Sequence, residues 1–100
     1  MLPFDWKIII NSNFSGLIEY DGGQHFAPNG KHGMKSFVST QSHDKIKNNF
    51  CEQEKIYLLR VDYTQCSKNL LLKHIVEFIK AIRNKQKKYV TYCGTKYIAN

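Results

Sequence analysis

Apolar and polar positions along the chain follow two periods, which predict both strands and helices. Residues 4–10 and 16–21 are rich in β-branched and aromatic side chains, as strands are. Residues 11–15 between them have turn chemistry, so we expect an antiparallel hairpin. The run 56–63 predicts a third strand, and 89–98 favours either a last strand or an irregular tail.

The first helix is predicted between the second and third strands. Ser39 or Thr40 can cap a helix that runs to about Glu54, with Ile46 and Phe50 on one face. The preceding segment, 24–38, is expected to be a long loop because it contains three residues that break helices, Pro28, Gly30 and Gly33.

The second helix has the stronger pattern. It is predicted to begin at Ser67 or Asn69 and to end near Arg83. Its apolar positions repeat with the 3.6-residue period, at Leu71, Ile75, Phe78, Ile79 and Ile82. The order of elements is then β-β-α-β-α, which predicts one α/β domain over residues 1–100, with a mixed sheet of about three to four strands and two helices.

Composition narrows the class of protein. One hundred residues allow one domain, and 42% hydrophobic residues are too many for a disordered chain. The chain has no apolar run near the roughly 18 residues of a membrane span and no signal peptide, so we expect an intracellular protein without a membrane partner, whose gene could belong to a virus or mobile element. Three cysteines without a CxxC pair support neither a zinc ribbon nor a disulfide framework.

The net charge of +7 is concentrated in the last third of the chain. Residues 1–67 are neutral, with seven basic and seven acidic side chains, whereas 68–100 hold eight basic side chains and one acid, Glu77. A basic segment of this kind suits a polyanion such as nucleic acid, although lysine-rich ends also serve solubility alone. Thirteen of the fifteen basic residues are Lys, which favours contact with the phosphate backbone over reading of bases.

Three acids and a histidine are expected to converge at one end of the hairpin. Pairing of the first two strands sets Asp5 near Glu19 and Asp21, and these two share a face because side chains alternate. His25 follows a Gly-Gly pair that allows the backbone to turn back. Clustered carboxylates need a proton or a cation between them, and they suit Mg²⁺. The alternative is that these acids are solvated and that the glycines only make a turn.

The residues around these acids resemble a nuclease family. The segments LPFDW (2–6), IEYDGGQHF (18–26), HDKIKN (43–48) and LLRV (58–61) are similar to the very-short-patch-repair (Vsr)-like endonucleases, which belong to the PD-(D/E)XK, or restriction-endonuclease-like, superfamily. The similarity spans residues 2–63. It implies a restriction-endonuclease-like fold and Mg²⁺-dependent, or Mn²⁺-dependent, hydrolysis of DNA phosphodiester bonds.

The same resemblance implies individual roles. Asp5, Asp21, His25 and Asp44 match catalytic positions, with Asp44 working beside the histidine. Asp5, Glu19 and Asp21 match the metal ligands. Relatives usually carry a helix with a glutamate before the first strand, and we expect both to be missing because the chain begins at Met1, four residues before Asp5. Relatives also often have Arg at the position of His43.

Three hypotheses follow from the sequence. The first is a metal-dependent DNA endonuclease-like protein. The second is a catalytically inactive or truncated nuclease fold that binds nucleic acid, and the third is a structural fragment whose lysines only confer solubility. The first two predict phosphate contacts from the basic residues near the site and in the basic C-terminal helix and tail (68–100), with the oligomeric state left open: Lys45, Lys47, Lys80, Arg83, Lys85, Lys87 and Lys88.

Overall fold

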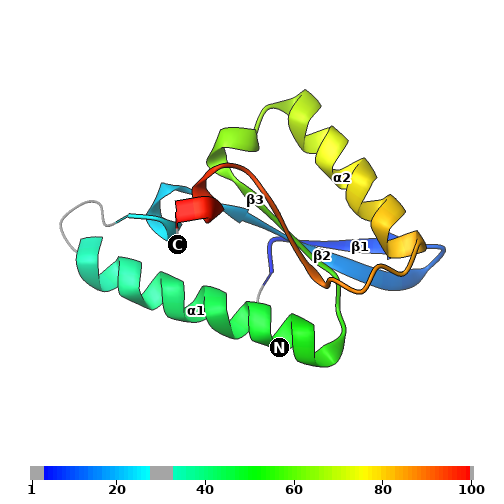
Figure 1. Cartoon of the computed structure of the whole chain (residues 1–100), viewed down its shortest axis with the longest axis horizontal. Coiled ribbons are helices and arrows are strands. Elements are labelled where there is room, and N and C mark those ends of the chain that lie inside the picture. Colours follow the sequence, from blue (N-terminus) through cyan, green and yellow to red (C-terminus); the bar gives the residue numbers. More distant parts are fainter. Residues whose placement is uncertain (1–3, 28–32, 100) are drawn as a thin grey trace.

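The computed structural model describes residues 4–27 and 33–99, in which a mixed four-stranded sheet lies between two helices (Figure 1). The strands are β1 (Trp6–Ile10), β2 (Asn13–Asp21), β3 (Leu58–Asp62) and β4 (Val90–Cys93). The helices are α1 (Gly33–Glu54) and α2 (Lys68–Arg83). Three single turns of 3₁₀ helix complete the fold: η1 (Gly23–His25), η2 (Tyr63–Gln65) and η3 (Lys96–Ala99). The α/β fold with a mixed sheet and two helices is confirmed, and the segment 89–98 contains a strand.

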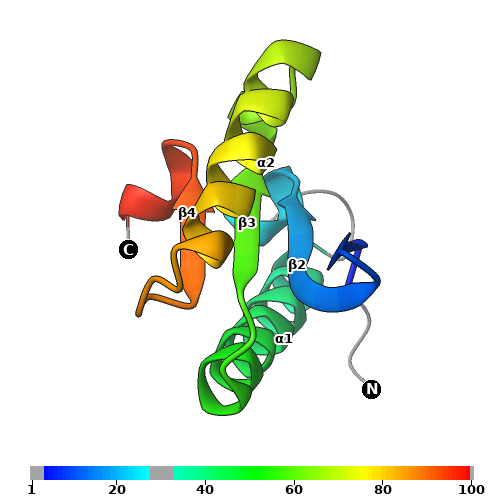
Figure 2. The same ribbon diagram turned by 90° about the vertical axis from the view of Figure 1, so that its right-hand side faces the viewer.

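The strands are arranged in sequence order, β1-β2-β3-β4. The β1–β2 pair is antiparallel, as predicted for a hairpin, while β2, β3 and β4 are parallel. The chain therefore crosses over twice in the same direction across the sheet, through α1 and then through α2. These helices lie on opposite faces (Figure 2), so the two crossovers have opposite hands. One of them is the left-handed form that is rare among parallel strands.

Each helix packs on its own set of alternate strand residues. On the α2 face, Ile18, Leu59 and Val61 pack against Phe78. On the α1 face, Leu17, Leu58 and Val90 pack against Cys51, which is fully buried. Burial raises the pKa of the Cys51 thiol to about 11, so this side chain stays protonated and acts as a small apolar residue.

The α1 face of the sheet changes character halfway along the parallel strands. In β2, Leu17 is followed on this face by Glu19 and Asp21, and in β3, Leu58 is followed by Arg60 and Asp62. We call the first part the apolar half and the second part the charged half. All four charged residues are buried, so the charged half needs polar partners of its own.

Helix α1 matches this division. Its Cys51 covers the apolar half, whereas Asn48 and Asp44, one and two turns earlier, contact Arg60 in the charged half. The predicted apolar face of this helix is wrong in part: Phe50 packs on the core, but Ile46 is 52% exposed. The stripe that faces the sheet is mostly polar, so hydrophobic periodicity does not reveal it.

The start of α1 is also corrected. The helix begins at Gly33 and not at Ser39 or Thr40, so residues 33–38 are helical where a loop was expected. Residues 34–54 of the helix contain no Gly or Pro, and the helix extends back to Gly33, the last glycine of the preceding segment. Several positions named above lie outside the described residues: Met1, residues 2–3, Pro28 and Gly30.

The second helix agrees closely with its prediction. Ser67 is its N-cap, and the Ser67 hydroxyl accepts a hydrogen bond from the Leu70 amide at 3.4 Å. Within the described part of the chain, no helix is both long and apolar enough to cross a membrane.

Candidate functional site

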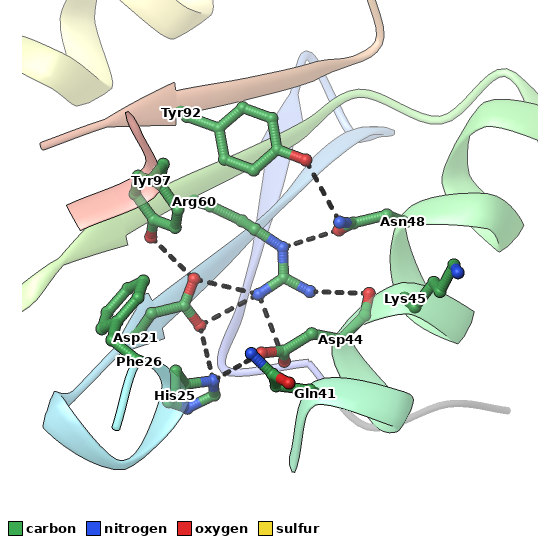
Figure 3. Close-up of a pocket in the computed structure, with 10 residues that line it drawn as sticks. All are labelled: Asp21, His25, Phe26, Gln41, Asp44, Lys45, Asn48, Arg60, Tyr92 and Tyr97. Atoms are coloured by element: carbon green, nitrogen blue, oxygen red, sulfur yellow. Dashed lines mark hydrogen bonds and ion pairs between the residues drawn. The ribbon is translucent and has the colours of Figure 1, made fainter. Parts of the chain in front are cut away.

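A pocket of about 640 Å³ opens over the charged half of the sheet (Figure 3). It is bounded by the ends of β2, β3 and β4, by the segment after β2 and by α1. Aromatic rings form one side, and charged and amide groups form the rest (Asp21, His25, Phe26, Gln41, Asp44, Lys45, Asn48, Arg60, Tyr92 and Tyr97).

The base of the pocket is a buried ion pair between neighbouring strands. Arg60 and Asp21 are 2% and 1% exposed, and Arg60 Nη1 lies 2.9 and 3.0 Å from the two Asp21 oxygens. Arg60 Nη2 donates to the Asp44 carbonyl and Nε donates to the Asn48 side chain. Burial lowers the pKa of the guanidinium, but the charges of Asp21 and Asp44 outweigh this, so its pKa is raised and it stays charged.

His25 completes the site by joining the two carboxylates. The Gly22–Gly23 pair leads into η1, which returns the imidazole toward the strand end. Its Nδ1 lies 2.7 Å from Asp44 Oδ2 and 3.3 Å from Asp21 Oδ1. Both neighbours are acceptors, so Nδ1 carries the hydrogen. The hydrogen bond with Asp44 raises the pKa of His25, burial opposes this, and the Asp21 charge adds to the increase.

The segment after β4 contributes a second hydrogen-bond donor to the Asp21 carboxylate. The Tyr97 hydroxyl donates to Asp21 Oδ2 at 2.7 Å. Burial and this hydrogen bond raise the pKa of Tyr97. The backbone that carries Tyr97 is itself fixed, because the Lys96 amide donates to the buried Asp62 carboxylate. Gly94, with φ of +132°, passes against that carboxylate where a Cβ atom would overlap it.

Asp5 and Glu19 form a separate polar cluster on the β1 side. The Asp5 amide donates to Glu19 Oε1 at 3.1 Å, and Asp5 Oδ2 accepts from the Tyr20 amide. Lys47 Nζ donates to Glu19 Oε2 at 3.1 Å. Burial raises the pKa of Glu19, and Lys47 opposes this increase. The expected proximity of Asp5 and Glu19 is therefore found, with their oxygens bound to backbone and lysine.

The candidate residues named from the sequence divide into two groups. Asp21, His25 and Asp44 come together, with ligand atoms within 4.8 Å of one another, and no other group of three acids, histidines or cysteines does so among residues 4–27 and 33–99. Asp5 and Glu19 lie in the neighbouring cluster. Asp21 alone belongs both to the predicted metal set and to the observed group.

The basic candidates are also divided in space. Lys45 lines the pocket, and Lys47 is bound to Glu19. The others lie in the last turn of α2 and in the segment before β4. This segment leads into the start of β4, whereas the pocket is at the ends of β2 and β3, so these basic residues lie at the other end of the sheet (Figure 1): Lys80, Arg83, Lys85, Lys87 and Lys88.

The donor set fits a hard divalent cation in part. The carboxylates of Asp21 and Asp44 are suitable ligands for Mg²⁺ or Mn²⁺ and would hold the ion, whereas the imidazole of His25 is a softer donor whose Nδ1–H is already bound to Asp44. The charge of Asp21 is already balanced by Arg60, and its two oxygens already accept hydrogen bonds from Arg60 and Tyr97. Asp44, whose side chain is 21% exposed, is the more accessible of the two carboxylates.

Six residues of the pocket had no predicted role. Arg60 is the one with a signal in the sequence, because it is a charged residue inside the otherwise apolar run Leu58-Leu59-Arg60-Val61. A charge at such a position has to find a buried partner. The other five have no comparable signal, since they reach the pocket only through the packing of α1, of β4 and of the segments after β2 and β4: Phe26, Gln41, Asn48, Tyr92 and Tyr97.

Comparison of the chain with protein-family models, with curated proteins and with solved structures gives no match.

Proposed function

We propose that the protein is a metal-dependent DNA endonuclease-like protein that hydrolyses phosphodiester bonds in this pocket. The observation that carries the proposal is the hydrogen-bonded pair of His25 and Asp44, 2.7 Å apart, beside Asp21 in an open pocket. The Vsr-like pattern of the sequence supports the same function, because it implies this pairing of histidine and helix aspartate.

His25 is the general base in this proposal. Its Nδ1–H donates to Asp44, so in the neutral ring Nε2 is the nitrogen that can accept a proton from water. Asp44 orients the ring and stabilises its protonated form, as a carboxylate does in other catalytic pairs. Mg²⁺ or Mn²⁺, when bound, would polarise the phosphoryl oxygen and stabilise developing charge. Lys45 lines the same pocket and can contact a phosphate.

A second function is favoured by Arg60. Its guanidinium already neutralises Asp21 and contacts Asp44, which reduces the electrostatic need for a metal ion. A protein of this kind would be a catalytically inactive nuclease fold that binds nucleic acid through lysines. The two functions differ in cleavage and agree in binding.

Plasmid nicking separates these functions. Wild-type protein is incubated with supercoiled DNA in Mg²⁺, in Mn²⁺ or in EDTA, and compared with His25→Gln and Asp44→Asn. We expect nicking that needs the metal and is reduced at least about 100-fold in both variants, as is typical when a general base is lost. His43→Gln is the matched control, because His43 is exposed next to Asp44 and should leave the rate unchanged.

The metal set implied by the resemblance is tested in the same assay with Asp5→Asn. Because Asp5 is bound to the Tyr20 amide, we expect a smaller loss than for Asp44→Asn. A complete loss would assign Asp5 to the metal. Wild-type protein that retards DNA on a gel but never cuts it is the inactive binding module, and the proposed hydrolysis is then rejected.

A further inference from the structure

Three aromatic rings form a continuous wall of the pocket. Phe26 and Tyr97 meet edge to face, with centroids 5.3 Å apart, and Tyr97 and Tyr92 lie 4.9 Å apart. They come from the segment after β2, from η3 and from β4, and Figure 3 shows them on one side of Arg60. We call Phe26, Tyr92 and Tyr97 the aromatic wall.

The hydrolysis proposed above does not use this wall. The Tyr97 hydroxyl is bound to Asp21, and the Tyr92 hydroxyl accepts from Asn48 Nδ2 at 3.2 Å, so both phenols are held in place. Tyr92 is nevertheless 43% exposed. A ring that is fixed by its hydroxyl and open to the pocket is a preformed stacking surface for a flat ligand.

The groups opposite the wall suit a nucleotide. Gln41 supplies an amide donor and acceptor, and Lys45 supplies a positive charge for a phosphate. The volume, about 640 Å³, is in the range of pockets that enclose small ligands. An aromatic face, amide groups and a cation are the three kinds of contact made to single-stranded nucleic acid.

We infer that the aromatic wall binds an unpaired nucleobase of the DNA strand, so that the substrate is single-stranded or locally unpaired DNA. The inference rests on the proposed function. In a duplex both faces of each base are covered by its neighbours, so a base reaches the pocket only at an end, in an unpaired tract or after flipping, which is energetically costly.

The first test uses wild-type protein alone, in EDTA so that no DNA is cut. Fluorescence anisotropy compares a labelled 12-nucleotide strand, the same strand annealed to its complement and a 12-nucleotide strand of abasic sites. The abasic strand keeps the phosphates and lacks the bases. We expect the ordinary strand to bind about tenfold more tightly than either of the others, the effect of about one base–aromatic stack.

Variants assign the effect to the pocket. Tyr92→Ala should weaken binding of the ordinary strand about tenfold and leave the abasic strand unchanged, while Tyr92→Phe, which keeps the ring, should stay close to wild type. Tyr20→Ala is the matched control, because Tyr20 is 40% exposed and alternation places it on the α2 face.

Competition by deoxythymidine monophosphate tests a free nucleotide as the source of the base. If deoxythymidine monophosphate displaces the labelled strand at the same concentration as the unlabelled strand does, the pocket is assigned to mononucleotides and the inference is overturned.

Equal binding of ordinary and abasic strands, or tighter binding of the duplex, also overturns the inference. These results leave the proposed function standing if the protein nicks plasmid DNA. Absence of binding to every DNA tested, together with absence of nicking, rejects both.

Discussion

His25 is the residue whose protonation the site controls. Its Nδ1 faces two carboxylates, one at 2.7 Å and one at 3.3 Å, while Arg60 supplies an opposing positive charge nearby. The balance favours the imidazolium and raises the pKa above the ordinary value of 6.5. A general base acts in its unprotonated form, so the raised pKa of His25 moves its working range to higher pH.

This gives a prediction for pH dependence. NMR titration of His25 should give a midpoint above 6.5, and Asp44→Asn should lower it, because the largest cause of the shift is removed. The raised pKa means that the pair contributes stability that is fully present below pH 6.5 and is lost as pH rises through the His25 midpoint. The nicking rate should rise over the same interval. A midpoint unchanged in Asp44→Asn would contradict the assigned pairing.

Arg60 is the residue that links the base of the pocket to α1. It serves Asp21, Asp44 and Asn48 from a position that is 2% exposed. Arg60→Met leaves Asp21 buried without its partner and should lower the free energy of unfolding by about 3–5 kcal/mol, measured by urea titration. Adding Asp21→Asn should recover part of this loss, since the unpaired charge is then removed.

Arg83→Met is the control for this experiment. Arg83 is exposed in the last turn of α2, and its removal should change the stability by less than about 0.5 kcal/mol. Equal losses for Arg60→Met and Arg83→Met would show that the buried ion pair contributes no stability.

Among the elements, η3 owes its position against Asp62 to one glycine, Gly94. Gly94 adopts φ of +132°, a conformation that L residues rarely adopt, and a Cβ atom there would overlap the Asp62 carboxylate. Gly94→Ala should cost about 1–3 kcal/mol and should release the Lys96 amide from Asp62. Hydrogen exchange at the Lys96 amide would become faster. Gly23→Ala is the control, because no atom lies within 4 Å of its added Cβ.

Periodicity predicted those elements whose buried face is apolar. Helix α2 carries Leu71, Ile75 and Phe78 at helical spacing, so its cap and length followed from the sequence. Helix α1 turns Asp44 and Asn48 toward the sheet, and a polar stripe of this kind looks like a solvated face. Its start and the exposure of Ile46 were therefore predicted wrongly.

In the site, the residues that are close in sequence could be predicted together, and those that are distant in sequence could not. Asp21 and His25 are close in sequence, and alternation together with the Gly-Gly turn was enough to bring them into one hypothesis. Asp44 was assigned only through the family resemblance, because nothing local marks it. Arg60 and Tyr97 reach Asp21 from 39 and 76 residues away, and contacts over such separations depend on strand order and crossovers.

At the scale of the molecule, the basic segment before β4 and the pocket lie at opposite ends of the sheet. The pocket lies at the carboxyl ends of β2 and β3, and the lysines before β4 lie at the opposite end. β3 is five residues long, so the two regions are about 16 Å apart. Sixteen ångströms corresponds to about five base pairs of duplex or a shorter run of extended single strand.

A salt titration tests whether the far lysines contact DNA. The triple variant Lys85→Gln, Lys87→Gln, Lys88→Gln should lower the slope of log K against log salt by up to about 3 on DNA that spans both regions. On strands too short to reach the opposite end of the sheet, the triple variant and wild type should bind alike. Lys7→Gln, an exposed change on β1, is the control. An unchanged slope on long DNA would restrict the contacts to the pocket.

The division of the α1 face into apolar and charged halves has a consequence for how this protein can diverge. In the apolar half, Leu17, Leu58 and Val90 can be exchanged one at a time for other side chains of similar volume. In the charged half, Asp21 and Arg60 satisfy each other and Arg60 also contacts Asp44 of α1, so these three residues are constrained to change together or not at all. On the α1 face of β3, we therefore expect substitutions to be tolerated at Leu58 and to be rare at Arg60, only two residues further along the same strand.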